Sequence, residues 1–287
     1  MASPVPARFR LFLNNAAIYL GRSMPLGELA NWLFGGSDDK GRTAPGPRLS
    51  APGKPTVMVS DDVEAEIREA EKLTRDGPTR AAFGEFVRAV HALVEKRDVS
   101  PPVLAALVAG LDCRHKALRE GAGQQIMRLS HHFPEIGRQL LDILEGDHRE
   151  RRLAVIQSIW RVTPPHDTAV NLLRKGLTDR EERVRFFAVD RIRTGEFREL
   201  LPELKELRQR ETDAKLRRFI DFNVGLLETG FYVEENAATG DRVVTVALGK
   251  GGLSSKSIPA AEYSPEKVKE VLEKLRSDWR RLQGKSA

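Results

Sequence analysis

Four arginines recur at an almost constant interval in the middle of the chain, and this period constrains the fold more than any other feature. Arg119, Arg152, Arg185 and Arg217 are 33, 33 and 32 residues apart. A small or branched apolar residue lies three positions after each arginine, and an isoleucine or valine lies seven positions after it. Two series of leucines repeat with the same spacing: Leu107, Leu140 and Leu173, and Leu111, Leu144 and Leu177. Such a period indicates stacked copies of one supersecondary unit rather than a single closed core.

Each period is predicted to be a pair of antiparallel helices joined by a short turn. We call the helix that contains the repeated arginine the first helix of a pair, and its partner the second helix. Four pairs are predicted, at 78–96 with 101–111, 113–131 with 134–144, 148–162 with 166–177, and 180–194 with 197–209, followed by a single first helix at 212–227. Proline opens several second helices, where its missing N–H costs nothing: Pro101, Pro134 and Pro165. Aspartates that can cap exposed N–H groups precede several first helices: Asp112, Asp147, Asp179 and Asp213.

The aspartate at the turn, followed by Val184-Arg185-x-x-Ala188 in the first helix, resembles the HEAT repeat, an α-solenoid unit. The resemblance covers 79–227, about half of the chain, and is best at 179–192. Elsewhere Arg151 replaces a valine of the family pattern, and Gly121 and Gly123 lie inside a first helix. The resemblance implies that the repeated arginines pair with an aspartate of a neighbouring repeat and form a structural ladder: Arg119, Arg152, Arg185 and Arg217.

Two segments of different character precede the repeats. Residues 1–34 are predicted to form two short helices, which we interpret as an N-terminal docking segment that packs on the repeats or on a partner. A basic amphipathic membrane or organelle-targeting segment and simple disorder are the alternatives. Residues 35–56 are rich in glycine, proline and serine and are predicted to be a flexible linker. The solenoid is then predicted over 57–230, beginning with a charged helix that Asp61 and Asp62 cap.

The period ends after Gly230. Residues 231–258 are predicted to form a β-hairpin followed by a flexible loop, because two short alternating apolar runs flank a turn-rich stretch. Residues 259–287 are predicted to contain an amphipathic helix, with Ser264 as its cap and Pro265 at its first position. The hairpin and the helix would cover the apolar end of the last repeat.

The composition narrows the class of protein. The net charge of +6 permits an acidic partner, including nucleic acid, without requiring one. The single cysteine, Cys113, excludes an intramolecular disulfide and favours a reducing compartment. No run of about 18 apolar residues is present, and the first ten residues lack the features of a secretory signal. We therefore expect a cytoplasmic protein without a membrane span.

No stretch of the sequence predicts catalysis. The histidines and Cys113 do not reproduce a zinc-binding spacing, and no nucleophile-elbow, zinc-protease or P-loop motif occurs. We interpret the glycine-rich stretch 249–252 as a connector, and Cys113 and Trp160 as packing residues. The sequence therefore predicts no enzyme, no metal site and no cofactor.

The sequence as a whole predicts an all-α fold, a short right-handed α-solenoid of about four HEAT-like helix pairs with a small C-terminal β-hairpin and a capping helix. Such a fold favours a non-catalytic scaffold or adaptor that binds another protein along the concave face. The residues expected on that face, on second helices, are Arg138, Asn171, Arg174, Lys175, Lys205 and Arg208. The alternative is a nucleic-acid-binding protein that uses the Arg-rich repeats, since 149–218 holds eighteen lysines and arginines against twelve acidic residues.

Overall fold

The computed structural model describes residues 63–72, 74–159, 162–248 and 252–284. The predicted docking segment at 1–34, the linker at 35–56 and Trp160 lie outside the described residues. Within the described ranges the chain is mostly helical, with eleven α-helices and one three-stranded antiparallel sheet. It divides into two compact units, residues 1–172 and 173–287. In none of these ranges is a helix both long enough and apolar enough to cross a membrane.

The first unit consists of helices that alternate as the 33-residue period predicts. After α3 (Val63–Glu71) come the first helices α4 (Gly77–Lys96), α6 (Lys116–Leu129) and α8 (Arg149–Ser158), and the second helices α5 (Pro101–Ala109) and α7 (Pro134–Glu145). Helix α9 (His166–Leu177) is the second helix that follows α8, and the boundary between the units lies within it. Prolines begin α5 and α7 as predicted.

The aspartates before the first helices cap fewer of them than predicted. Asp213 does cap its helix, since its Oδ1 accepts a hydrogen bond of 2.7 Å from the backbone N–H of Leu216. The residue at the cap position of α6 is His115 and that of α8 is His148, and neither caps with its side chain. The prediction was wrong at these two helices because they begin four and two residues after Asp112 and Asp147, so that a histidine and not the aspartate occupies the cap position.

A glycine inside α6 allows two first helices of the first unit to pack closely. Gly123 is unexpected at this place, because glycine destabilises the interior of a helix. In the structure, a methyl group at position 123 would overlap the Oγ of Ser158 on α8. The α6–α8 contact therefore requires a residue without a side chain at this position.

The second unit continues with one helix pair and ends in a small α/β element. Helices α10 (Glu182–Thr194) and α11 (Leu201–Arg210) form the pair, and α12 (Ala214–Thr229) is the next first helix. Strands β1 (Phe231–Glu235), β2 (Arg242–Ala247) and β3 (Leu253–Ile258) follow in an antiparallel sheet of order β1-β2-β3. Helix α13 (Pro265–Gly284) closes the chain, as predicted from its cap and apolar face.

The third strand corrects the predicted loop after the hairpin. Residues 253–258 pair with β2, and the Oγ of Ser255 lies 2.8 Å from the Oγ1 of Thr245. The sequence does not signal this strand because its central residues are exposed serines and a lysine rather than alternating apolar residues. Only Ile258, at its end, is fully buried.

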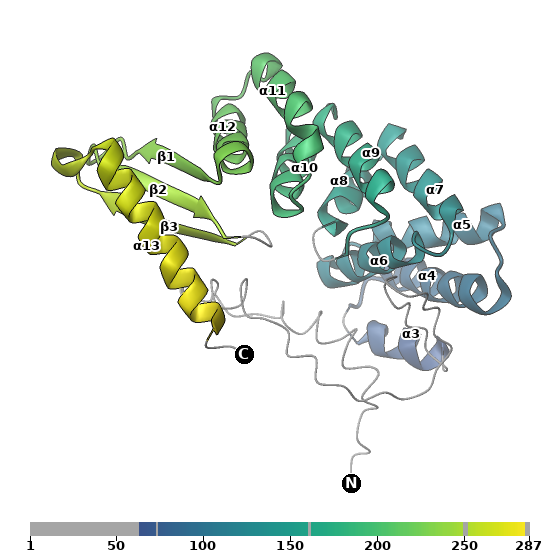
Figure 1. Ribbon diagram of the computed structural model, residues 1–287. Coiled ribbons are helices and arrows are strands. Elements are labelled where there is room, and N and C mark those ends of the chain that lie inside the picture. The colour runs from purple at the N-terminus through teal and green to yellow at the C-terminus, as the bar shows by residue number, and fades with distance from the viewer. Residues whose placement is uncertain (1–62, 73, 160–161, 249–251, 285–287) are drawn as a thin grey trace, which may run out of the picture. The chain divides into compact units, whose positions relative to one another are not determined.

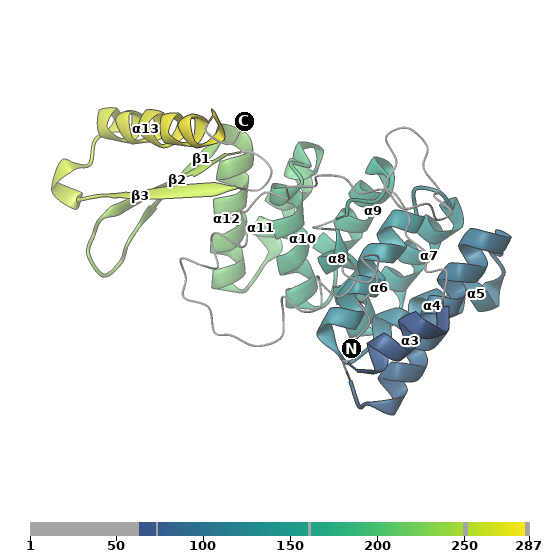
Figure 2. The same ribbon diagram turned by 90° about the horizontal axis from the view of Figure 1, so that it is seen from below.

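Helices α12 and α13 both pack on the sheet. Figure 2 shows α13 along the strands, and its apolar side chains form one core with those of the sheet: Val244, Val246, Ile258, Val268, Val271 and Leu272. On α12, a methyl group at Gly225 would approach the Tyr232 ring of β1 to 2.7 Å. Strand β1 therefore packs directly against α12, the last of the first helices.

Candidate binding surfaces

The repeated arginines make one contact in common, and it differs from the predicted one. A guanidinium N–H donates to the carbonyl oxygen six residues earlier in three copies: from Arg119 to Cys113 at 3.0 Å, from Arg152 to Gly146 at 2.9 Å and from Arg185 to Asp179 at 3.0 Å. The arginine thus ties the turn that precedes its own helix to that helix. This local role accounts for the constant position of the residue in the repeat.

The fourth repeated arginine does not take the predicted structural role. Arg217 is exposed, and its side chain makes no hydrogen bond or ion pair with any residue that the structure describes. The position six residues earlier is occupied by Glu211, whose carboxylate pairs with Arg185 of the preceding copy. The prediction was therefore wrong for Arg217.

Ion pairs between neighbouring repeats do exist, but with other partners. Arg185 contacts the Glu211 carboxylate at 2.8 Å, so the acidic partner is a glutamate rather than an aspartate. In the first unit Arg151 donates from Nε to Asp112 of the preceding repeat at 2.6 Å. This hydrogen bond to Asp112 raises the pKa of Arg151 above its usual value. Arg151, which stands where the HEAT pattern has a valine, thus links these two repeats.

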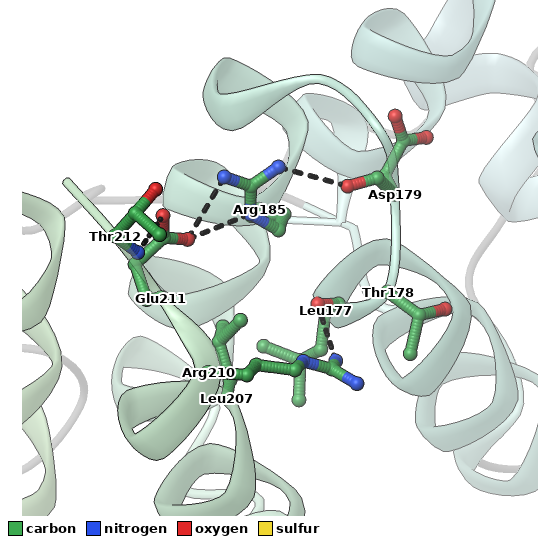
Figure 3. A pocket seen from close by; sticks show the side chains of 8 residues that line it. All are labelled: Leu177, Thr178, Asp179, Arg185, Leu207, Arg210, Glu211 and Thr212. Carbon is green, nitrogen blue, oxygen red and sulfur yellow. Dashed lines mark hydrogen bonds and ion pairs between the residues drawn. The ribbon is translucent and has the colours of Figure 1, made fainter.

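A cavity of about 320 Å³ lies beside the Arg185–Glu211 pair within the second unit (Figure 3). Its polar groups already bind one another, because Arg210 donates to the carbonyl oxygen of Leu177 at 3.2 Å and Glu211 accepts from the N–H of Thr212 at 3.0 Å. The Glu211 side chain is only 3% exposed and that of Arg185 is 17% exposed. These groups hold the pair α10–α11 and the start of α12 together, and they leave few polar atoms for a ligand.

The environment of Glu211 favours its charged form. Burial acts to raise its pKa, but the N–H of Asp213, the Arg185 guanidinium and the N–H of Thr212 together outweigh burial. The pKa of the carboxyl therefore lies below its usual value. The Glu211 carboxylate is therefore charged at neutral pH, and its contact with Arg185 stabilises the joint between the repeats.

The residues predicted on the concave face are distributed over both units. Arg138 on α7 and Asn171 on α9 belong to the first unit and are exposed, and Arg138 lies 3.5 Å from Glu135 of the same helix. The other four belong to the second unit: Arg174, Lys175, Lys205 and Arg208.

Three of these cations form a row of ion pairs across α9, α11 and α12. Arg174 donates to Glu203 at 2.9 Å, Arg208 donates to Asp221 at 2.8 Å, and Lys205 pairs with Glu228. The hydrogen bond to Asp221 raises the pKa of Arg208. In each case the acidic partner comes from a helix later in the chain. The charge of this row is therefore neutralised within the protein.

The structure also assembles a row of aromatic side chains in the second unit, which the sequence analysis missed. The Phe186 and Phe219 rings stack at 4.3 Å, Phe219 and Phe222 lie nearly parallel at 6.5 Å, and Tyr232 meets Phe222 edge-on at 5.4 Å. We call these four residues of α10, α12 and β1 the aromatic row. A signal was present, because Phe186 and Phe219 are 33 residues apart, close to the 32-residue interval between Arg185 and Arg217, and so lie within one position of each other in successive repeats.

The only cysteine has the environment of a packing residue, as predicted. The side chain of Cys113 is fully buried, and its Sγ lies 3.8 Å from the carbonyl oxygen of Thr79. Burial, followed by the nearby Asp112 carboxylate, raises the pKa of the thiol to about 12. The thiolate is therefore not formed at neutral pH. Among the described residues no group of three histidine, cysteine or acidic side chains could hold a metal ion.

Comparisons with known proteins add no relative. No protein-family model matches the chain, and neither a curated protein nor a solved structure matches it. The resemblance to the HEAT repeat therefore rests on the residues of the repeats themselves.

Proposed function

We propose that this protein is a non-catalytic scaffold or adaptor that binds another protein along the layer of its second helices. The proposal includes a right-handed α-solenoid in which the helix pairs of both units stack as HEAT-like repeats. It is supported by the 33-residue period and by the shared contact from the repeated arginine to the carbonyl six residues earlier. Solenoids of this kind present extended surfaces that suit large partners.

The ion pairs of α9, α11 and α12 are the observation that favours a protein over nucleic acid as the partner. Nucleic acid is attracted by lysines and arginines whose charge is available for phosphates. Arg174, Lys205 and Arg208 each already face a carboxylate. A surface with paired charges produces little positive potential at a distance, but it can still exchange hydrogen bonds with a protein of mixed charge.

The proposal places the protein in the cytoplasm. Cys113 is the only cysteine, so the fold uses no disulfide and loses nothing in a reducing compartment.

A co-purification experiment tests the proposed function. The full chain would be tagged and recovered from native lysate with and without nuclease, at low and at moderate salt. We expect a protein partner that survives nuclease and salt and that is lost with the double variant Asn171→Ala/Arg208→Ala. The variant Lys269→Ala, at an exposed position of α13, is the control and should retain the partner.

The opposite result would favour the alternative. Nucleic acid that is recovered without nuclease and released by moderate salt would indicate phosphate contacts. The Arg-rich repeats would then be the surface to map, and the scaffold proposal would fail.

A further inference from the structure

The aromatic row leaves apolar surface open to solvent. Phe186 is 38% exposed, and it is one of three large apolar side chains that the described part of the chain leaves exposed. One of the others, Tyr263, is covered by the guanidinium of Arg242, 5.3 Å from its ring centre. Phe219, Phe222 and Tyr232 are half-buried and continue the row from Phe186. An exposed aromatic that continues into a row of partly exposed rings is typical of an interaction surface.

The packing of the rings argues against a nucleobase as the occupant. Proteins bind single-stranded nucleic acid by stacking bases on open ring faces. In the aromatic row the faces of Phe186 and Phe219 stack on each other at 4.3 Å, with an angle of 16° between the rings. Phe219 is also nearly parallel to Phe222. The shared faces are closed to a base.

Cations on the same helix faces provide charge complementarity to an acidic partner. Arg183 lies three residues before Phe186, and Lys215 lies four residues before Phe219, so each shares a helix face with a ring. Both are exposed, and neither side chain makes a hydrogen bond or ion pair within the described ranges.

Acidic residues near the row offset this charge only in part. Glu182 lies one turn before Phe186, Glu234 is paired with Arg218, and Asp190 is paired with Arg191 and Arg193. Asp221, beside Phe222, is paired with Arg208. Arg183 and Lys215 therefore remain as exposed cations that no ion pair in the described ranges neutralises.

We infer that the aromatic row is a second interaction surface, which binds an acidic peptide segment that carries apolar side chains. Apolar side chains of the peptide would contact Phe186 and Phe219, while its carboxylates would pair with Arg183 and Lys215. The positive edges of aromatic rings also favour carboxylates. The surface is formed by α10, α12 and β1, so the inference does not rest on the proposed partner of the second helices.

Neither the N-terminal segment nor a copy of it fits this chemistry. Residues 1–34 carry Arg8, Arg10 and Arg22, and their first acidic residue is Glu28. This charge would repel Arg183 and Lys215. The N-terminal segment is therefore not the expected occupant, and the inference commits to an acidic segment of another protein.

A peptide selection tests the inference with defined probes. Random peptides of about 15 residues, long enough to form a marginal helix, would be displayed on phage, selected on the immobilised full chain and counter-selected on Phe186→Ser. We expect the enriched peptides to combine aspartate or glutamate with leucine, isoleucine or phenylalanine.

Point variants then locate the contact by fluorescence anisotropy with a labelled selected peptide. We expect Phe186→Ser and Lys215→Glu each to weaken binding about tenfold, as loss of a central contact does. Arg217→Glu is the matched control, because it makes the same change in charge on the same helix but two residues from Phe219, on a different face. It should alter the affinity less than about twofold. Circular dichroism would show that all three variants remain folded.

Three outcomes would overturn the inference. The first is a selection that enriches basic peptides, or a selection that yields no peptide with a preference for the wild-type chain over Phe186→Ser. The second is equal sensitivity to Lys215→Glu and Arg217→Glu, which would indicate general charge attraction. The third is an oligothymidylate of about 15 nucleotides that binds the wild type and is lost with Phe186→Ser, which would identify a nucleic-acid surface.

Discussion

The contact between Arg185 and Glu211 should be one of the strongest single links of the second unit. The two side chains are 17% and 3% exposed and meet at 2.8 Å, so the pair is shielded from solvent. A hydrogen bond between charged groups contributes about 1.5–3 kcal/mol. Arg185→Ala also removes the hydrogen bond to the carbonyl oxygen of Asp179, at 3.0 Å, which is worth about 1 kcal/mol.

The surroundings of Glu211 limit the cost of losing its partner. A buried charge left without any partner costs about 3–5 kcal/mol. Glu211 would keep the N–H groups of Thr212 and Asp213, at 3.0 and 3.2 Å. We therefore expect Arg185→Ala to lower the free energy of unfolding by about 2–4 kcal/mol, the loss of its two contacts.

A double-mutant cycle would measure the pair itself. The variants are Arg185→Ala, Glu211→Gln and both together, and the measurement is urea unfolding followed by circular dichroism. Because the chain has two units, hydrogen exchange of peptides from α10 to α12 would show that the loss lies in the second unit. We expect a coupling energy of about 1–2 kcal/mol. Arg217→Ala, at an exposed position without a partner in the described ranges, should change stability by less than about 0.5 kcal/mol.

A coupling below about 0.5 kcal/mol would refute this reasoning, because a shielded and well-aligned pair cannot behave like an exposed one. A loss of protection in α4 to α8 instead of α10 to α12 would also contradict it.

Three further predictions concern packing, pH and reactivity. Gly123→Ala should destabilise the first unit by about 1–3 kcal/mol in thermal unfolding because its methyl group would overlap Ser158, whereas Gly77→Ala, with open space around it, should not. Glu211 has a lowered pKa in the folded state, so its contribution to stability is present above its unfolded pKa, near 4.5, and is lost as the pH falls through the folded pKa. Glu211→Gln should therefore flatten the loss of stability in acid unfolding curves, and an unchanged slope would contradict this. Cys113 should resist alkylation by iodoacetamide in the native protein and react only after unfolding, since burial raises its pKa to about 12.

The alternation of helices could be predicted from the sequence because it depends on local signals. The prolines at the start of α5 and α7 and the cap of α13 act within one or two turns of helix, and the 33-residue period repeats the same local pattern along the chain. Interactions between residues that are this close in the chain can be recognised from a single sequence. The third strand could not be predicted for the opposite reason, since Ser255 and Lys256 become strand residues only through pairing with β2.

The roles of the arginines were predicted only in part because their partners lie outside the repeat pattern. The contact to the carbonyl six residues earlier belongs to one copy and is therefore periodic. The contacts between copies depend on which acidic residue comes within reach, and this differs between Arg151 with Asp112 and Arg185 with Glu211. The sequence shows that such residues are charged, but not which pairs meet.

The aromatic row shows how the same period can give a surface rather than a core. Residues about one period apart in a stacked repeat lie near each other, and Phe186 and Phe219, which are 33 residues apart and one position out of step in the repeat, stack at 4.3 Å. The apolar positions that recur in all copies fill the core, as Ala122, Val155 and Ala188 do. Phe186 and Phe219 lie one or two positions after the repeated arginine, and among the repeats with that arginine only α10 and α12 carry a phenylalanine there. An outward aromatic residue that occurs in only some copies is not needed for the packing that all copies share. Such residues are therefore the first to test for a role in binding.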